Sequence, residues 1–215
     1  MQFAIIVVFI IIVMVGVMIG KDKERYREPG EATDTRNFIE FGEPARSLYT
    51  STKILTLHHH IEITDDKGNL VYRAETQFPS IHDKTDIYTA DGQHVAYIER
   101  KLITLREVHY IDMENGKSFT LSNEILHIIR DVTNIEGLGW ILEGNILALN
   151  FTIRDAAGNL IAVVGQKLFS VHDKFVVDIY ETDYEEEVVA ILVTLQHMLR
   201  DRVAAASSGG AGSDS

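Results

Sequence analysis

Residues 185–202 read EEEVVAILVTLQHMLRDR, and this stretch decides which folds the chain can adopt. The run from Val188 to Val193 carries no polar side chain, so a helix here lacks a solvent-facing side. Thr182 and Glu185 have the spacing of a capping box, which marks the start of a helix. Because a helix that is apolar on all sides is buried on all sides, we predict a helix that the rest of the domain surrounds.

A β-sheet is predicted to supply this surrounding structure. Short runs of alternating or β-branched residues fill residues 47–181, and turn signals separate them. The Asp91-Gly92 and Asn115-Gly116 pairs are typical of hairpin turns, because both residue types tolerate a positive φ. The pattern gives roughly twelve closely spaced strands, which indicates a β-barrel or a β-sandwich.

The chain also repeats itself across half of the predicted domain. The segment ITDDKGNL at 63–70 returns as IRDAAGNL at 153–160, 90 residues later. At the same offset, IHDK at 81–84 returns as VHDK at 171–174, and an Asp-Ile-Tyr triplet follows each copy with a slip of two residues. A repeat of this length is too long for a solenoid and predicts two similar β-units that close one pseudo-symmetric sheet.

Several motifs resemble those of a known family. They are TADGQHVAYIERKL at 89–102, FTIRD at 151–155 leading into GNL at 158–160, and KLFS at 167–170 followed by HDKFVVDI at 172–179. In this order, and with the apolar helix after them, they resemble the LURP-one-related proteins, which belong with the tubby C-terminal-like and phospholipid-scramblase proteins. The resemblance covers residues 46–202. It implies a mainly β fold, a closed antiparallel barrel of about twelve strands with the C-terminal helix threaded through it.

An apolar segment at the N-terminus predicts a single transmembrane helix ahead of this barrel. Phe3 to Ile19 reads FAIIVVFIIIVMVGVMI, which has no charge or proline and is just long enough to cross a bilayer. A cleaved signal peptide would have positive residues before the run and a small-x-small site after it, and neither is present. We therefore expect a lipid-bilayer anchor over residues 1–20 that uses Phe3, Ile5, Phe9, Ile12, Val15 and Ile19.

The flanking charges predict the orientation of this anchor. Lys21, Lys23, Arg25 and Arg27 all follow the apolar run, so the N-terminus is expected outside and the β-domain in the cytoplasm. Residues 21–46 are expected to be a polar linker, 47–202 the barrel domain with its helix at 185–202, and 203–215 a disordered tail of small polar residues.

Composition excludes several functional classes. The chain has no cysteine, which rules out disulfides and thiolate chemistry. Its formal net charge of −12 argues against nucleic acid as a partner, because binding phosphates needs a basic surface. The consecutive His58, His59 and His60 would alternate between the faces of a strand, so they cannot converge on one ion.

Two groups of charged residues are candidate binding sites. A basic group could hold an anionic phospholipid headgroup, although ordinary surface charge is the alternative; it comprises Arg100, Lys101, Arg106, Lys167 and Lys174. An acidic group lies where scramblases carry a calcium segment, and helix capping with a solvated acidic face is the alternative; it comprises Asp178, Glu181, Asp183 and Glu185.

No nucleophile with a recognisable flanking motif is present, so we predict no catalytic residues, no enzyme activity and no cofactor. A helix that fills the barrel leaves no deep pocket for a small substrate, which puts function on the outer surface. The favoured function is a membrane-tethered binding or scaffold module, an accessory subunit that contacts another membrane protein. The alternative is phospholipid-headgroup binding or scramblase-like lipid handling.

Overall fold

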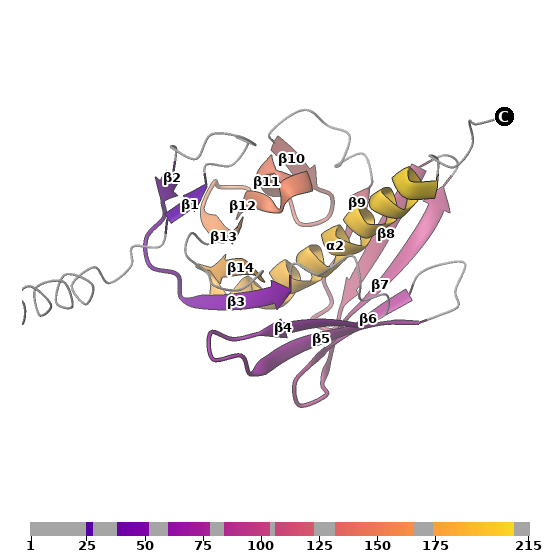
Figure 1. The fold of residues 1–215 in the computed structure, drawn as a ribbon, viewed down its shortest axis with the longest axis horizontal. Helices are drawn as coiled ribbons and strands as arrows, with labels where there is room; N and C mark the ends of the chain where they lie inside the picture. Colours follow the sequence, from indigo (N-terminus) through magenta and orange to yellow (C-terminus); the bar gives the residue numbers. More distant parts are fainter. Residues whose placement is uncertain are drawn as a thin grey trace, which may run out of the picture.

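One antiparallel sheet wraps around the C-terminal helix (Figure 1). The structure is a computed structural model, and it describes residues 25–27, 38–51, 60–77, 84–103, 106–122, 132–165 and 174–208. The strands of the large sheet are β3 (Arg46–Ser51), β4 (His60–Thr64), β5 (Leu70–Gln77), β6 (Lys84–Thr89), β7 (His94–Ile103), β8 (Arg106–Met113), β9 (Ser118–Ser122), β10 (Val132–Ile135), β11 (Trp140–Asn145), β12 (Asn150–Arg154), β13 (Leu160–Gly165) and β14 (Lys174–Ile179).

The sheet forms a nearly closed barrel. Its 12 described strands run in the order β10-β11-β12-β13-β14-β3-β4-β5-β6-β7-β8-β9, and every neighbouring pair in this order is antiparallel. The edge strands β9 and β10 meet in an isolated bridge between Thr120 and Glu136. The predicted barrel is therefore confirmed, but its closure is a narrow seam where a continuous ladder was expected.

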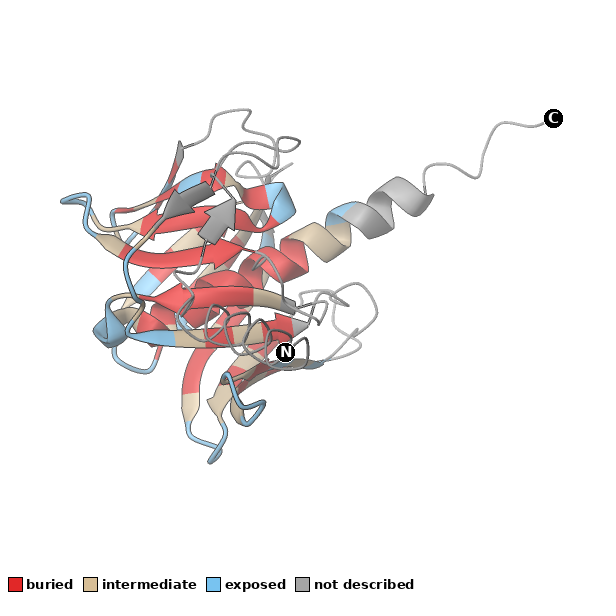
Figure 2. Cartoon of the chain, turned by 60° about the vertical axis from the view of Figure 1, so that its left-hand side comes forward, coloured by how far each residue is buried: buried red, intermediate tan, exposed pale blue. Residues whose placement is uncertain are grey.

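The C-terminal helix fills this barrel, as its sequence predicted. Helix α2 (Glu185–Ser208) follows a short 3-10 turn, η4 (Thr182–Tyr184), and every residue from Glu187 to Met198 is buried. Figure 2 shows this part of the helix in the buried colour inside the sheet. The helix runs on past the predicted end at Arg202, because the next residues include three alanines, which favour helix.

The repeat corresponds to two structurally matched units. Ala74 on β5 pairs with Ile87 on β6, and 90 residues later Val164 on β13 pairs with Val177 on β14. The offset of 90 thus holds through the strands, and the two-residue slip suggested by the Asp-Ile-Tyr triplets is wrong as a structural alignment. Cross-strand packing decides the register, because a slip of one residue would turn every side chain to the opposite face.

The same turn also closes the first hairpin of both units. The Asp65 side chain accepts bonds from the backbone N–H groups of Lys67 and Asn69, and Asp155 does the same for Ala157 and Asn159. The side-chain amide of Asn69 or Asn159 donates a further bond to each carboxylate. This bond is the largest cause of the lowered pKa of each carboxyl group, and the backbone bonds add to it. The paired aspartates therefore have a structural role in the turns.

Before the barrel, two short strands pair with each other. Strands β1 (Arg25–Arg27) and β2 (Phe38–Glu40) form a separate two-stranded antiparallel sheet within the predicted linker. The predicted transmembrane segment, with Phe3, Ile5, Phe9, Ile12, Val15 and Ile19, lies outside the described residues. Among the helices that the structure does describe, none is long and apolar enough to span a bilayer.

Candidate functional site

Helix α2 occupies the space in which a barrel of this size would hold a ligand. Its apolar side chains form one continuous core with the inward-facing residues of the strands. Leu48, Phe151 and Ile161 from the wall are fully buried against it, as are Ile191 and Leu195 of the helix. The surface open to a ligand or a partner is therefore the outer surface and the rims of the barrel.

Three tyrosines lie on the outer surface of neighbouring strands. Tyr88 is on β6, Tyr97 on β7 and Tyr110 on β8, and each ring is partly exposed. Their outward direction follows from strand alternation, because the residues on either side of Tyr97 and Tyr110 are buried inside the barrel. We call the outer surface around these three rings the tyrosine face.

Carboxylates flank the rings of the tyrosine face. In the strand register, Tyr97 lies between Asp86 on β6 and Asp112 on β8, and Tyr110 lies beside Glu99. The ring nitrogens of His94 face two further oxygens, Nε2 at 3.1 Å from Asp86 and Nδ1 at 2.5 Å from Glu114. The centre of this face is therefore acidic and aromatic.

The rings of this face already contact cations from the same chain. Lys101 Nζ lies 4.9 Å from the centroid of Tyr110 and 2.8 Å from Glu99 Oε2, and the bond to Glu99 raises the pKa of Lys101. Arg73 Cζ lies 5.4 Å from the centroid of Tyr88, whose pKa is raised by desolvation and then by the charge of Asp86. Two rings of this face thus each lie beside a positive charge from the same chain.

A shallow pocket opens beside Tyr110 at the seam of the barrel. It has a volume of about 240 Å³, and Asp112 and Glu136 are among the residues that line it. This is smaller than the pockets of roughly 300 Å³ or more that hold drug-sized ligands, and it suits a single side chain. Its other lining residues are Ile111, Ser118, Phe119, Thr120 and Gly137.

The predicted basic group is not brought together by the described part of the fold. Arg100 faces the barrel interior and pairs with Glu107 and Asp201 at 3.0 and 3.1 Å, whereas Lys101, the next residue on β7, faces outward. Arg106 begins β8, Lys174 lies five strands away from β7 on β14, and Lys167 lies outside the described residues. A single headgroup would thus not reach both Arg100 and Lys101.

The predicted calcium ligands have separate partners. Asp178 is buried and accepts a 2.5 Å bond from Ser47 Oγ, whereas Glu181 and Asp183 are exposed. Glu185 Oε1 accepts bonds from Arg46 and from the Tyr72 hydroxyl at 2.9 and 2.8 Å. Within the described residues, no three histidine or acidic side chains are grouped so that they could hold a metal ion.

Ion pairs and hydrogen bonds at the start of α2 account for Glu185 and Glu187 instead. Glu187 is buried and accepts bonds from Lys117 Nζ at 2.5 Å and from the Asn115 amide at 2.9 Å. Arg46 and Lys117 therefore hold the start of α2 from β3 and from the β8–β9 turn. The alternative of helix capping with a solvated acidic face fits only Glu181 and Asp183, which are exposed. Asp178 and Glu185 are buried, and the turn before α2 has no side-chain capping bond.

A comparison with protein-family models agrees with the resemblance seen in the sequence. The model of the LURP-one-related family matches residues 46–196. A crystal structure of a protein from Arabidopsis thaliana is 16% identical and covers 75% of this chain and 93% of that chain, with a TM-score of 0.46. No curated protein matches the sequence.

Proposed function

Because the chain belongs to the LURP-one-related family, we propose that it is a non-catalytic binding module, tethered to a membrane by residues 1–20, that engages another membrane protein through the tyrosine face. The partner segment is basic, since carboxylates surround the rings that it would contact. One observation carries this proposal: the helix fills the barrel, while Tyr97 stands outward between Asp86 and Asp112.

The chemistry of the tyrosine face suits a protein partner. Tyrosines dominate the energetics of many protein interfaces, because they combine a large apolar ring with a polar hydroxyl. A lysine or arginine side chain of the partner would enter the pocket beside Tyr110 and approach Asp112 and Glu136. The net charge of −12 would speed the approach of such a basic segment.

Lipid-headgroup binding is the weaker candidate on the same observations. An anionic headgroup would meet the carboxylates of Asp86, Asp112 and Glu114 on this face. Arg100 and Lys101, which the sequence singled out for such a role, are already paired with carboxylates. A headgroup would have to displace these contacts before it could bind.

The test is affinity purification of the full-length chain from detergent-solubilised membranes, with mass spectrometry of proteins and lipids. The variants Tyr97→Ala and Asp112→Lys remove a ring and reverse a charge on the tyrosine face. Glu62→Lys is the matched control, because it makes the same charge change at an outward position on β4. We expect a stoichiometric protein partner with the wild type and Glu62→Lys, and at least a tenfold loss with either face variant.

The salt dependence of this capture adds a second readout. A basic partner segment should dissociate as ionic strength rises, because exposed charges are screened. Equal recovery by Asp112→Lys and the wild type would contradict the proposal. Enrichment of anionic lipid without a protein partner would reverse the order of the two candidates.

A further inference from the structure

The outer wall formed by β12, β13, β14 and β3 differs from an ordinary solvent-facing surface. Val163 on β13 and Val176 on β14 point outward, because their neighbours Val164 and Val177 point into the core. Both outward valines are nevertheless only 1% exposed. Asp178, also at an outward position, is fully buried. A second layer must therefore cover this side of the barrel.

The segment just before β3, the first strand of the barrel, supplies part of this layer. Phe41 packs against Val163 and Val176, in a cluster that also includes Leu160, Tyr49 and Tyr180. The Tyr180 hydroxyl donates a bond of 3.2 Å to the backbone carbonyl of Gly42. We call residues 38–45 the arm, and through Phe41 and Gly42 it contacts strands from both ends of the barrel sequence.

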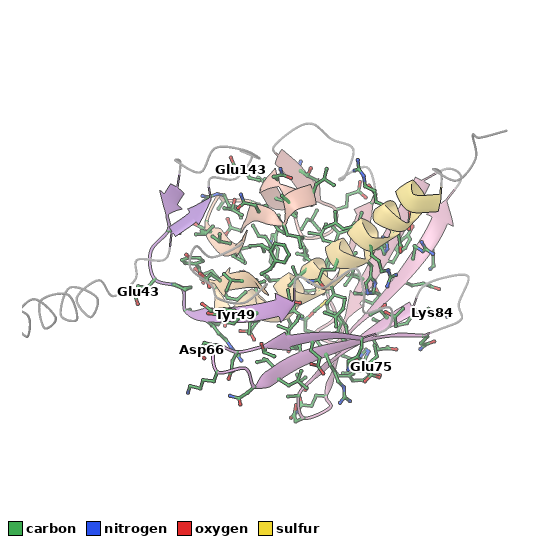
Figure 3. The ribbon with its side chains drawn as sticks, in the orientation of Figure 1. Glu43, Tyr49, Asp66, Glu75, Lys84 and Glu143 are labelled. Carbon is green, nitrogen blue, oxygen red and sulfur yellow. The ribbon has the colours of Figure 1, made fainter. Side chains whose placement is uncertain are left out.

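The chain before the arm folds back on itself. Strand β1 pairs with β2 so that Arg25 lies opposite Glu40 and Arg27 opposite Phe38. Figure 1 draws this hairpin on the side of the barrel where β12 and β13 lie. In Figure 3, Glu43 and Tyr49 are labelled on the side of β3, whereas Glu75 and Lys84 are labelled on β5 and β6.

We propose that the outer wall of β12, β13, β14 and β3 is a docking site for the arm, and that this contact sets both the distance and the direction in which the barrel is held from the N-terminal anchor. The occupant is a segment of this same chain. The contact is apolar at Phe41 and polar at Gly42, which gives it both affinity and register. The membrane consequence rests on the proposed function, but the docking itself does not.

Docking and pairing shorten the reach of the linker. If residues 21–45 were fully extended, they would let the barrel move about 90 Å from the anchor. With β1 paired to β2, only about ten residues and one strand spacing separate residue 20 from the barrel, which is roughly 40 Å. The barrel is therefore held close to the bilayer.

The direction follows from the strand order. In the ring of 12 strands, β13 and β14 lie about half a turn from β7 and β8. The arm therefore holds the barrel by the wall opposite the tyrosine face. The tyrosine face points away from the attachment, where a segment of a neighbouring membrane protein that extends beyond the bilayer can reach it.

Spin-label distance measurements on the full-length chain in detergent test the docking. The chain has no native cysteine, so cysteines introduced in pairs label cleanly. One label replaces Gly42, where an added Cβ meets no atom within 4 Å, and the other replaces Glu143, which is 49% exposed on β11. We expect a single narrow distance distribution. A broad distribution in the wild type would overturn the proposal.

Substitutions on each side of the contact make the test specific. Val163→Asp and Phe41→Asp should each broaden the distribution, since both place a charge in the apolar contact. Val108→Asp is the matched control, at an outward position on β8, and should leave the distribution narrow. A second pair at Glu75 and Glu143 reports on the barrel alone and should stay narrow throughout. An unchanged distribution in Phe41→Asp would overturn the proposal even if Val163→Asp unfolds.

A nanodisc measurement tests the direction. A fluorophore is attached to a cysteine that replaces either Glu143 or Glu75, and nitroxide-labelled lipid in the nanodisc is the quencher. The extent of quenching is then compared between the two positions. We expect stronger quenching at position 143, on the side of the arm, and equal quenching would overturn the orientation. The distance measurement needs neither a membrane nor a partner, so failure to find a partner would leave the docking result intact.

Discussion

Two outer walls of this barrel, on β13 and β14 and on β6, β7 and β8, differ in what they carry. On both walls, every second side chain points outward. On β13 and β14, the outward valines are buried beneath the arm, and the wall carries an intramolecular contact. On β6, β7 and β8, the outward positions hold Tyr88, Tyr97 and Tyr110, which are partly exposed among charges. One repeated sheet thus carries a covered wall, which is the proposed attachment side, and the tyrosine face, which is the proposed recognition side. The outward residues distinguish the two.

The inner surfaces of the two walls differ as well. Behind the arm, Val164, Val177 and Ile179 give α2 an apolar wall. Behind the tyrosine face, the inward residues include the polar Thr85, Arg100 and His109. Helix α2 places polar residues on the same side, where His197 lies beside Thr85, Asp201 accepts a bond from Arg100, and Arg200 lies near His109. The comparison predicts that the recognition side is the less robust half of the barrel, and the following experiments test it.

Acid should have the largest effect. Burial, followed by the charges of Arg100 and Arg200, lowers the pKa of His109 to about 4. Burial lowers the pKa of His197 to about 3, with Arg200 as the next contributor. Both folded values lie below the unfolded value of about 6.5, so the stability is complete above pH 6.5 and falls as the pH drops toward the folded pKa values. In that window, each histidine should lower the free energy of unfolding by about 1.4 kcal/mol for each pH unit of acidification.

Urea unfolding at pH 7 and pH 5 measures this loss, which should reach about 2 kcal/mol for each histidine. Hydrogen exchange at pH 5 should rise in β8 before it rises in β13 and β14. The double variant His109→Leu/His197→Leu should have a flatter pH profile between the same limits. An unchanged slope in that variant would assign the acid sensitivity to other groups.

Gly137→Ala should have the next largest effect, because it opens the seam beside the recognition side. Gly137 has a φ of +101°, and an added Cβ would lie 2.6 Å from the Ser118 carbonyl oxygen. We expect a loss of about 3 kcal/mol from strain and collision together. Gly92→Ala is the control, since φ there is +88° with no atom within 4 Å of the added Cβ, and it should cost about 1 kcal/mol. Equal losses of unfolding free energy in the two variants, measured in urea, would show that the backbone at the seam moves to make room for the added Cβ.

A matched pair of cations gives the smallest effects. Arg46→Gln on β3 removes the ion pair of the buried Glu185 and leaves its hydrogen bond from the Tyr72 hydroxyl. This change should lower the free energy of unfolding by about 2 kcal/mol. Lys101→Gln breaks an outer pair with Glu99 in which the lysine side chain is 48% exposed, and should cost less than about 0.5 kcal/mol. Thermal melts of the two variants compare them directly. A larger shift for Lys101→Gln would mean that the tyrosine face supports the fold.

The buried helix and the many-stranded sheet could be predicted from patterns in the sequence, which left a barrel or a sandwich open, and the family resemblance implied the closed barrel. Val188 to Val193 has no polar side, and the structure buries all of it. The way in which the barrel closes depends on contacts between residues far apart in the chain. The seam at Thr120 and Glu136, and the pairing of β3 with β14, reflect tertiary contacts that no local pattern encodes.

The candidate site was harder to predict for the same reason. Clustered charge in the sequence drew attention to Arg100 and Lys101, but strand alternation sends them to opposite faces. Tyr88, Tyr97 and Tyr110 are spread over three strands, and only the register brings them together. Alternation marks each of them as outward, so a correct strand alignment would have been the missing signal.

The place of β3 has a consequence for synthesis on the ribosome. This first strand of the barrel pairs with β14, and the bonded Ser47 and Asp178 are 131 residues apart. The barrel therefore cannot close, nor its helix enter, until almost the whole domain has been translated. Until then, any sheet that β4 to β9 form lacks the helix that covers its apolar inner surface in the finished barrel, and we expect such long-range pairing to make folding slow.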